Sequence, residues 1–152
     1  MHIVLVEPEI AGNTGNIART CAVTKTTLHL VRPLGFETDD KHLKRAGLDY
    51  WHLLDLHYHD SFEEIEKAYP NARFFMATTH GGLRYTDFRY DENDFLVFGK
   101  ETAGLPKELL ERYEGSCIRI PMGKDLRSLN LANSVAIIVY EALRQQNFLD
   151  LT

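Results

Sequence analysis

Short apolar runs rich in β-branched residues alternate with stretches of helical pattern along the whole chain. Continuous apolar runs of this length are typical of strands that are buried on both faces of a parallel sheet. Five runs are clear, namely Ile3 to Val6, Leu28 to Val31, Arg73 to Thr78, Phe95 to Phe98 and Ile118 to Ile120. A weaker signal covers Leu53 to Leu56. Strands that alternate with helices predict an α/β fold around a mostly parallel sheet.

Capping residues and helix breakers locate the helices between these strands. Thr38 is a candidate cap for a short basic helix that ends near Gly47. Ser61 and Glu64 have the spacing of a capping box, and Pro70 ends the helix that they would begin. The remaining predicted helices are Gly15 to Val23, Pro106 to Tyr113 and Leu131 to about Gln146.

Length and composition favour one globular domain over residues 1–152. The formal net charge is -5, so no general basic coat for nucleic acid exists, and an RNA or DNA partner must be met by a local patch. Cys21 and Cys117 are too few for a disulfide framework and read as reduced, partly buried residues. No apolar run approaches the roughly 20 residues of a membrane span, and no basic segment of a signal peptide precedes His2. We therefore expect a cytoplasmic protein without a membrane partner.

The predicted closing helix is apolar around nearly its whole circumference for three turns, between Leu131 and Leu143. A helix on the surface of a monomer normally keeps a polar stripe. Either the helix is deeply buried, or one face packs on the sheet and the other on a second copy of the chain. The second interpretation is favoured, because a domain of this size rarely encloses a helix completely.

Three predicted strands are followed by loops rich in Gly, Asn and Ser, and ligands of parallel sheets bind at such strand ends. The loops cover Glu7 to Arg19, Gly99 to Pro106 and Pro121 to Leu131. The first strand is not followed by G-x-G-x-x-G, and Leu105-Pro106 replaces the Lys and Ser or Thr of a P-loop. Ser128 has no nucleophile-elbow context. These observations argue against a Rossmann dinucleotide site, nucleotide hydrolysis and a serine hydrolase.

Several other residues have simple structural interpretations. His57 and His59 lie two apart, which predicts a solvated pair rather than a metal site, since no further ligand pattern accompanies them. His80 is expected in a plain loop, and Tyr50 and Trp51 in the core or an interface rather than as a platform for base stacking. Arg19 differs, because a guanidinium one turn into a helix after a Gly/Asn loop is well shaped to hold a phosphate.

Three segments together resemble the motifs of the SPOUT (trefoil-knot) RNA 2'-O-ribose methyltransferases. They are Asn13 to Arg19, Phe98 to Pro106, and Ile118 to Met122 leading to Ser128 to Leu131. The opening Glu7 to Ile10 and the segment Arg45 to Tyr50 are similar to the minimal subfamily that methylates the wobble cytidine or uridine of tRNA. The resemblance covers essentially the whole chain. It implies S-adenosylmethionine as donor, a deep trefoil knot near the C-terminus, an obligate homodimer and no metal, with tRNA-Leu isoacceptors as the expected substrates.

The resemblance also assigns roles to residues. It implies catalytic roles for Arg19, Glu101, Ser128, Asn130 and Tyr140, with Glu101 orienting Arg19. It implies donor contacts for Ala77, Thr78, Gly99, Glu101, Gly104, Ile120, Met122, Ser128, Leu129 and Asn133. Candidate RNA contacts are Asn13, Asn16, Arg19, Lys41, Lys44, Arg45, Lys124, Arg127 and Arg144. Three alternatives stay open: another tRNA or rRNA site, a non-catalytic knotted RNA-binding protein, and a flavodoxin-like enzyme of small molecules.

Overall fold

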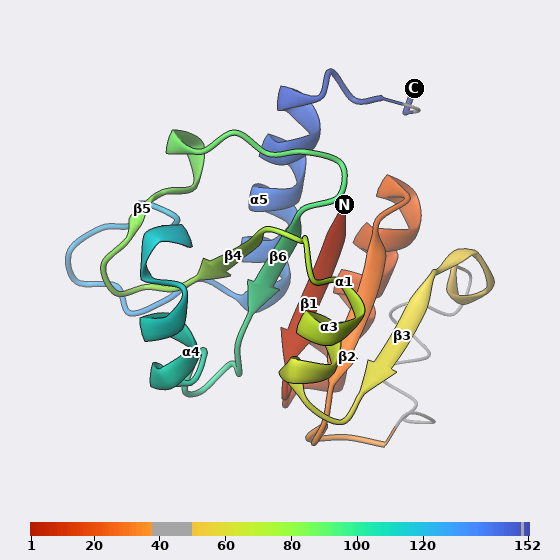
Figure 1. Cartoon of the computed structure of the whole chain (residues 1–152), viewed down its shortest axis with the longest axis horizontal. Coiled ribbons are helices and arrows are strands. Elements are labelled where there is room, and N and C mark those ends of the chain that lie inside the picture. Colours follow the sequence, from red (N-terminus) through yellow and green to blue (C-terminus); the bar gives the residue numbers. More distant parts are fainter. Residues whose placement is uncertain (38–49, 150) are drawn as a thin grey trace.

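In the computed structural model, which describes residues 1–37, 50–149 and 151–152, one parallel sheet runs through the centre of the molecule (Figure 1). Within the described residues the sheet has seven strands in the order β3-β2-β1-β6-β4-β7-β5. The strands are β1 (His2–Val6), β2 (Thr27–Val31), β3 (Leu56–His59), β4 (Phe74–Ala77), β5 (Leu83–Arg84), β6 (Phe95–Phe98) and β7 (Cys117–Arg119). The prediction of an α/β fold with a mostly parallel sheet is confirmed.

The strand order is not the order of the chain. β1 lies between β2 and β6, with Leu5 opposite both Leu30 and Phe98. After β4 the chain forms β5 at one edge, returns to add β6 on the other side of β4, and then inserts β7 between β4 and β5. The carboxyl ends of β6, β4 and β7 are therefore neighbours, although their sequence positions are far apart.

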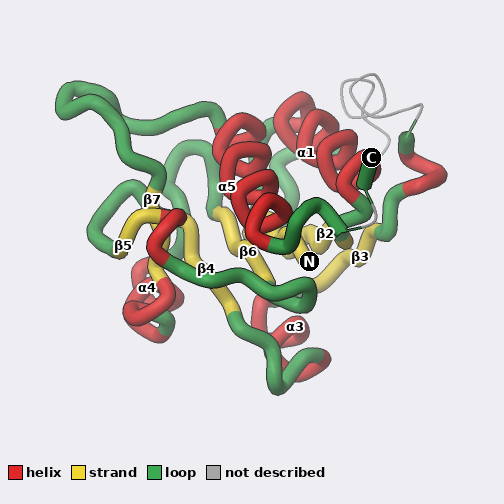
Figure 2. The backbone as a smooth tube through the Cα atoms, turned by 90° about the horizontal axis from the view of Figure 1, so that it is seen from above, coloured by secondary structure: helices red, strands yellow, loops and turns green. Residues whose placement is uncertain are grey.

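Helices cover both faces of the sheet (Figure 2). One face carries α1 (Ala11–Thr24) and α5 (Leu131–Gln145), and the other carries α3 (Phe62–Ala68) and α4 (Lys107–Arg112). Short 3-10 helices η1 (Trp51–Leu53), η2 (Tyr85–Asp87) and η3 (Glu114–Ser116) join other elements. The first core combines Ile17 and Cys21 of α1 with Val135 and Ile138 of α5. Both cysteines are free and buried, and no helix in the described part of the chain is long and apolar enough to cross a membrane.

Two predicted element boundaries are wrong. The first helix begins at Ala11 rather than Gly15, because the backbone N–H groups that precede it find an acceptor in a distant loop, described below. The strand predicted over Leu53 to Leu56 is β3, which begins at Leu56 and runs on to His59. Leu53 is instead in η1, where 65% of it is exposed, and the backbone N–H of Leu54 closes that turn on Trp51.

The capping box predicted at Ser61 does not form. Ser61 is the N-cap residue of α3 but its side chain makes no capping hydrogen bond. The Glu64 carboxylate accepts the backbone N–H of Asp60, one residue earlier than the motif requires. The helix nevertheless ends before Pro70, as predicted, and α5 ends within one residue of its predicted limit. The helix predicted from Thr38 lies outside the described residues.

His57 and His59 are not the solvated pair that the sequence predicts. A chain of imidazoles crosses β1, β2 and β3: His2 Nδ1 lies 3.0 Å from His29 Nε2, and His29 Nδ1 lies 2.9 Å from His59 Nε2. His57 is exposed and pairs with Asp55, whereas His29 is fully buried. Burial lowers the pKa of His29 to about 3 and that of His2 to about 4. No group in the described residues is arranged to hold a metal ion.

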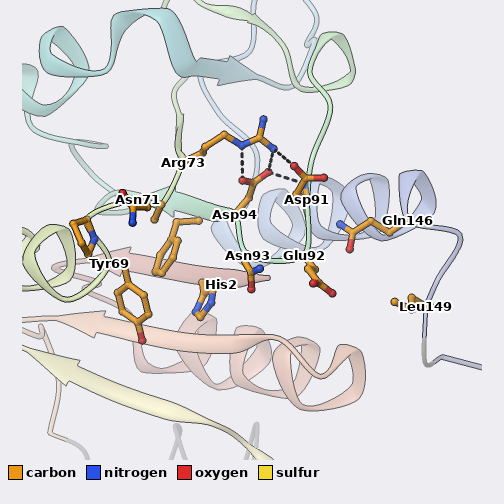
Figure 3. A pocket seen from close by; sticks show the side chains of 13 residues that line it. His2, Tyr69, Asn71, Arg73, Asp91, Glu92, Asn93, Asp94, Gln146 and Leu149 are labelled. Carbon is orange, nitrogen blue, oxygen red and sulfur yellow. Dashed lines mark hydrogen bonds and ion pairs between the residues drawn. The ribbon is translucent and has the colours of Figure 1, made fainter.

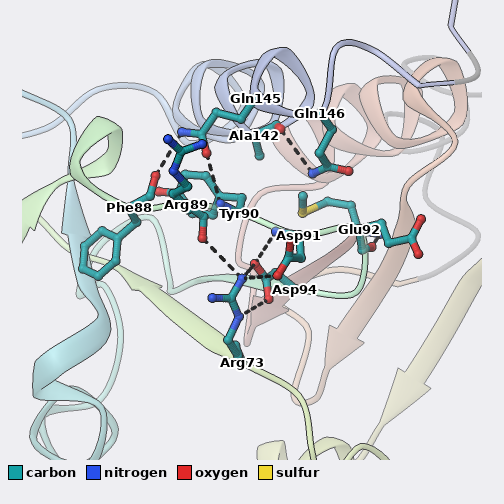
Figure 4. A network of polar contacts seen from close by, with 11 residues as sticks. Arg73, Phe88, Arg89, Tyr90, Asp91, Glu92, Asp94, Ala142, Gln145 and Gln146 are labelled. Atoms are coloured by element: carbon teal, nitrogen blue, oxygen red, sulfur yellow. Dashed lines mark hydrogen bonds and ion pairs between the residues drawn. The ribbon is translucent and has the colours of Figure 1, made fainter.

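At the amino ends of β4 and β6, Arg73 joins the two segments that lead into these strands (Figure 4). Its guanidinium donates to both carboxylate oxygens of buried Asp94, at 2.8 and 2.6 Å, and to Asp91 at 3.0 Å. These bonds hold the start of β4 against the turn that enters β6. The same residues line a shallow pocket together with His2 and Tyr69 (Figure 3).

The structure excludes deep burial of α5. Val135, Ile138, Val139, Ala142 and Leu143 are buried on one face of the helix. On the other face, 37% of Ile137 and 47% of Tyr140 are exposed. The alternative, packing of this face on a second copy, stays a prediction.

Candidate functional site

Four of the residues expected to contact the donor lie at neighbouring strand ends. Ala77 ends β4 and Thr78 follows it, Gly99 follows β6, and Ile120 follows β7. Adjacent strands lie about 5 Å apart, so the three ends form one short edge. The backbone N–H of Thr78 donates to the carbonyl oxygen of Ile118 at 2.9 Å and fixes the β4 end against β7.

The loop after β6 folds back tightly on itself. Lys100 and Gly104 exchange two backbone hydrogen bonds, of 3.2 and 2.9 Å. A side chain at Gly99 is excluded, because its Cβ would lie 2.1 Å from the Gly104 carbonyl carbon. Gly104 has a φ of +70°, which favours glycine. The glycines of this loop therefore serve its own folding, and they leave Thr102 to Gly104 exposed at the strand edge.

Glu101 joins this loop to the start of α1. Its carboxylate accepts the backbone N–H groups of Glu9 at 2.8 Å and Ile10 at 3.1 Å, and the Asn13 side-chain amide at 3.2 Å. Ile10, the N-cap residue of α1, has no capping side chain of its own. A carboxylate at a helix N-terminus satisfies open donors and complements the helix dipole. Glu101 thus acts as a distant cap, which explains why α1 begins four residues before its predicted start.

A reciprocal contact strengthens the same junction. The Glu9 carboxylate accepts the hydroxyl of Thr102, at 2.7 and 3.0 Å, and its backbone N–H at 3.0 Å. The Thr102 hydroxyl is the main cause of a lowered pKa of Glu9. Lys100 and Glu7 also form an ion pair of 2.5 Å between the two loops.

Asn13 and Asn130 connect the third loop to the first. The Asn130 side chain donates to Asn13 Oδ1 at 3.0 Å, while its own oxygen accepts the N–H groups of Ala132 and Asn133 and caps α5. Glu101, Asn13 and Asn130 therefore form one polar chain across the three loops that the sequence singles out. The family resemblance identified each residue, but the hydrogen bonds between them depend on the tertiary fold.

Arg19 lies elsewhere than predicted. Because α1 begins at Ala11, Arg19 is eight residues from the helix start, about 12 Å along the axis. Its guanidinium carbon is 4.7 Å from the centroid of the Tyr50 ring. The hydrogen bonds of Glu101 go to Glu9, Ile10 and Asn13, so the prediction that Glu101 orients Arg19 is wrong. Tyr140, nine residues into α5, is similarly distant from the start of its helix.

The other predicted site residues divide between two regions. Met122, Lys124, Arg127, Ser128 and Leu129 lie on the segment between β7 and α5, where 68% of Leu126 and 39% of Leu129 are exposed. Asn133 and Arg144 are exposed on α5, and Asn16 on α1. Arg144 pairs with Glu141 at 2.8 Å, so its charge is partly engaged. Lys41, Lys44 and Arg45 lie outside the described residues.

Known proteins similar to this chain share one kind of activity. The model of the SpoU rRNA methylase family matches residues 1–140. A Bacillus subtilis (strain 168) protein is 59% identical over 154 residues, which cover 99% of this chain and 96% of that protein. A Methylovorus glucosotrophus protein named tRNA (cytidine(34)-2'-O)-methyltransferase is 48% identical over 147 residues, 96% of each.

Solved structures that resemble this chain also concern RNA methylation. One that concerns the 2-OH methylation of C/U34 on tRNA has a TM-score of 0.92 and 48% identity, covering 96% of this chain and 95% of that one. An S-adenosylmethionine-bound rRNA methyltransferase from Sinorhizobium meliloti has a TM-score of 0.82 and 26% identity. That match covers 94% of this chain and 55% of the larger protein.

Proposed function

Because the chain belongs to the SpoU methylase family, we propose that it methylates the ribose 2'-hydroxyl of the wobble nucleotide in tRNA, with S-adenosylmethionine as the donor. The substrate is proposed from relatives that match nearly the full length of this chain and are named for position 34 of tRNA. The observation that carries the proposal is the convergence of the three motif loops through Glu101, Asn13 and Asn130. Cytidine, uridine or both, with tRNA-Leu isoacceptors as candidates, form the expected target.

The edge formed by β6, β4 and β7 fits such a donor. The segments around Thr78, Gly99 and Ile120 bring backbone groups to one edge. The segment that follows Ile120 adds the exposed apolar side chains of Leu126 and Leu129. A mixed site of backbone polar groups and apolar side chains suits an adenosine with a charged tail. The bound donor supplies a methyl group on a sulfonium. We propose that Ala77, Gly104, Met122, Ser128 and Asn133 complete this site.

Arg19 is proposed to act on the RNA rather than as a base. A guanidinium stays protonated in proteins, so it does not remove the proton of a hydroxyl. Its donors can instead hold the phosphate of the target nucleotide and stabilise negative charge that develops on the 2'-oxygen. Ser128 and Asn130 would hold the loop in place, and Tyr140 would contact substrate.

A homodimer reconciles the position of Arg19 with this role. Arg19 lies about 12 Å along α1 from the start of that helix, but a second copy can present its own strand edge to this arginine. The exposed apolar face of α5, with Ile137 and Tyr140, is suited to such packing. We also propose that the chain forms the trefoil knot near its C-terminus that the family resemblance implies.

The RNA must bind a protein of net charge -5. Lys124 and Arg127 on the loop between β7 and α5 are candidate phosphate contacts, joined by Lys41, Lys44, Arg45, Asn16 and Arg144. A splayed anticodon nucleotide suits this recognition, because single-stranded loops expose both base and 2'-hydroxyl. A cytoplasmic location is part of the proposal, and the free thiols of Cys21 and Cys117 support it.

Transfer of labelled methyl from S-adenosylmethionine to tRNA, followed by mapping of the modified nucleotide, tests the proposal. We expect 2'-O-methylation at position 34, its loss in Arg19→Ala, and an unchanged affinity of that variant for S-adenosylhomocysteine by calorimetry. Binding of tRNA and donor without transfer would instead indicate a non-catalytic RNA-binding protein. Failure to bind S-adenosylhomocysteine would contradict the donor site itself.

A further inference from the structure

Tyr50 is in contact with the arginine on which the proposed reaction depends. The Arg19 guanidinium carbon lies 4.7 Å from the centroid of the Tyr50 ring, within the range of a cation–π contact. Arg19 belongs to α1, and Tyr50 immediately precedes η1, which packs beside this helix. The two residues are 31 positions apart, so the contact is a product of the tertiary fold.

Comparison with two other arginines shows what is distinctive about this contact. Arg32 lies 5.1 Å from the ring centroid of Tyr58 and also pairs with Asp60 at 3.1 Å. Arg73 lies 5.5 Å from the ring centroid of Phe75 and also pairs with Asp94 and Asp91. Within residues 1–37, 50–149 and 151–152, Arg19 has no hydrogen bond or ion pair beside its aromatic contact. Its N–H groups are free for a ligand in this part of the chain.

The backbone that carries the Tyr50 ring is held in place. The Tyr50 carbonyl oxygen accepts the N–H of Leu53 at 2.9 Å and closes the turn of η1. The next residue, Trp51, packs against the core that α1 and α5 share, as does Leu54. Tyr50 itself is half-buried, while Arg19 is exposed. A fixed ring thus limits the positions available to a flexible side chain.

We propose that Tyr50 is a positioning residue for Arg19. The aromatic ring restrains the guanidinium without using its five donors, which lie in the plane of the group. An acidic partner would orient Arg19 as well, but it would compete with a phosphate for the same donors and neutralise the charge. The inference rests on the role proposed for Arg19 in methyl transfer.

The test compares Tyr50→Leu and Tyr50→Phe with the wild-type protein. We expect Tyr50→Leu to lower kcat for tRNA about fivefold, the factor that corresponds to about 1 kcal/mol of lost stacking. Tyr50→Phe keeps the ring and should restore the wild-type rate. The KM for S-adenosylmethionine should stay unchanged in both variants. Tyr58→Leu is the matched control, since it removes an aromatic partner from Arg32 and should leave kcat unchanged.

A spectroscopic measurement tests the contact independently of activity. Ring currents should displace the Arg19 Nε–H resonance in the NMR spectrum of the wild-type protein, and Tyr50→Leu should return it to the region of exposed arginines. The resonance is assigned from its disappearance in Arg19→Lys.

Several results would overturn the inference. These are an undisplaced Arg19 resonance in the wild type, full activity of Tyr50→Leu, or an equal loss in Tyr50→Phe. The wild-type spectrum decides the matter even if Tyr50→Leu does not fold. Absence of methyl transfer by the wild-type protein overturns the proposed function instead, before any variant is compared.

Discussion

His29 should make the stability of this protein sensitive to mild acid. Its imidazole is fully buried between His2 and His59, and both of its nitrogens are engaged, at 3.0 and 2.9 Å. Burial is the main cause of its lowered pKa of about 3, the neighbouring histidines His2, His59 and His57 add to it, and only Asp55 opposes it. The perturbation that tests this is His29→Gln, which removes the titrating group and keeps a hydrogen-bonding side chain.

The magnitude follows from the difference between the folded and unfolded pKa values of His29. The folded pKa of about 3 lies below the unfolded value of 6.5, so the unfolded state binds the proton first. The stabilisation is therefore complete above pH 6.5 and is lost progressively as the pH falls from 6.5 toward 3. Between pH 7.5 and pH 5, His29 alone should remove about 2 kcal/mol from the free energy of unfolding, because each pH unit below 6.5 costs about 1.4 kcal/mol.

Urea unfolding at a series of pH values and one protein concentration measures this effect. We expect the wild-type protein to lose about 2 kcal/mol more than His29→Gln between pH 7.5 and pH 5. Val31→Ala, on the same buried strand, is the control, since it removes methyl groups and no titrating group. Its profile should be displaced to lower stability at every pH with the slope of the wild type. Parallel profiles of His29→Gln and the wild type over this range would refute the reasoning.

Three further changes test other parts of the structure. Glu101→Ala leaves the backbone N–H groups of Glu9 and Ile10, just before α1, and the Asn13 side-chain amide without their acceptor, so we expect a loss of about 2 kcal/mol in urea unfolding; an unchanged stability would show that the cap is unimportant. Gly99→Ala places a Cβ 2.1 Å from the Gly104 carbonyl carbon and should abolish calorimetric binding of S-adenosylhomocysteine, whereas wild-type affinity would contradict the donor site. Ile137→Glu puts a charge on the exposed face of α5, so we expect sedimentation to detect dimers of the wild type and monomers of the variant, and dimers of both would contradict packing through this face.

The polar chain through Glu101 explains why predictions from the sequence were uneven. Capping rules read only neighbouring residues, so they could not identify a cap that is 91 positions away from Ile10. The true start of α1, and with it the position of Arg19, therefore differed from prediction. The same limit applied to Ser61, whose capping-box pattern was present although the bond was not made.

The histidines illustrate a second limit. The strand predicted over Leu53 to Leu56 stops short of His57 and His59, which lie in β3, and nothing local indicates that His2 and His29 stand beside them. Strand order decides which side chains meet across a sheet, and this order depends on contacts between distant segments. The contact between Arg19 and Tyr50 is another case, because no local sequence pattern predicts that these two side chains meet.

The sequence by itself determined the alternation of strands and helices, the α/β class, and the three Gly- and Asn-rich loops, because hydrophobic periodicity and glycine content are local properties. Only the tertiary structure decided that β7 enters between β4 and β5, that one carboxylate holds the start of α1, and that Arg19 rests on Tyr50. Each of these depends on residues that are brought together by burial of the shared cores. The free energy gained by burial depends on the total apolar surface that is removed from water and not on the sequence distance between the partners.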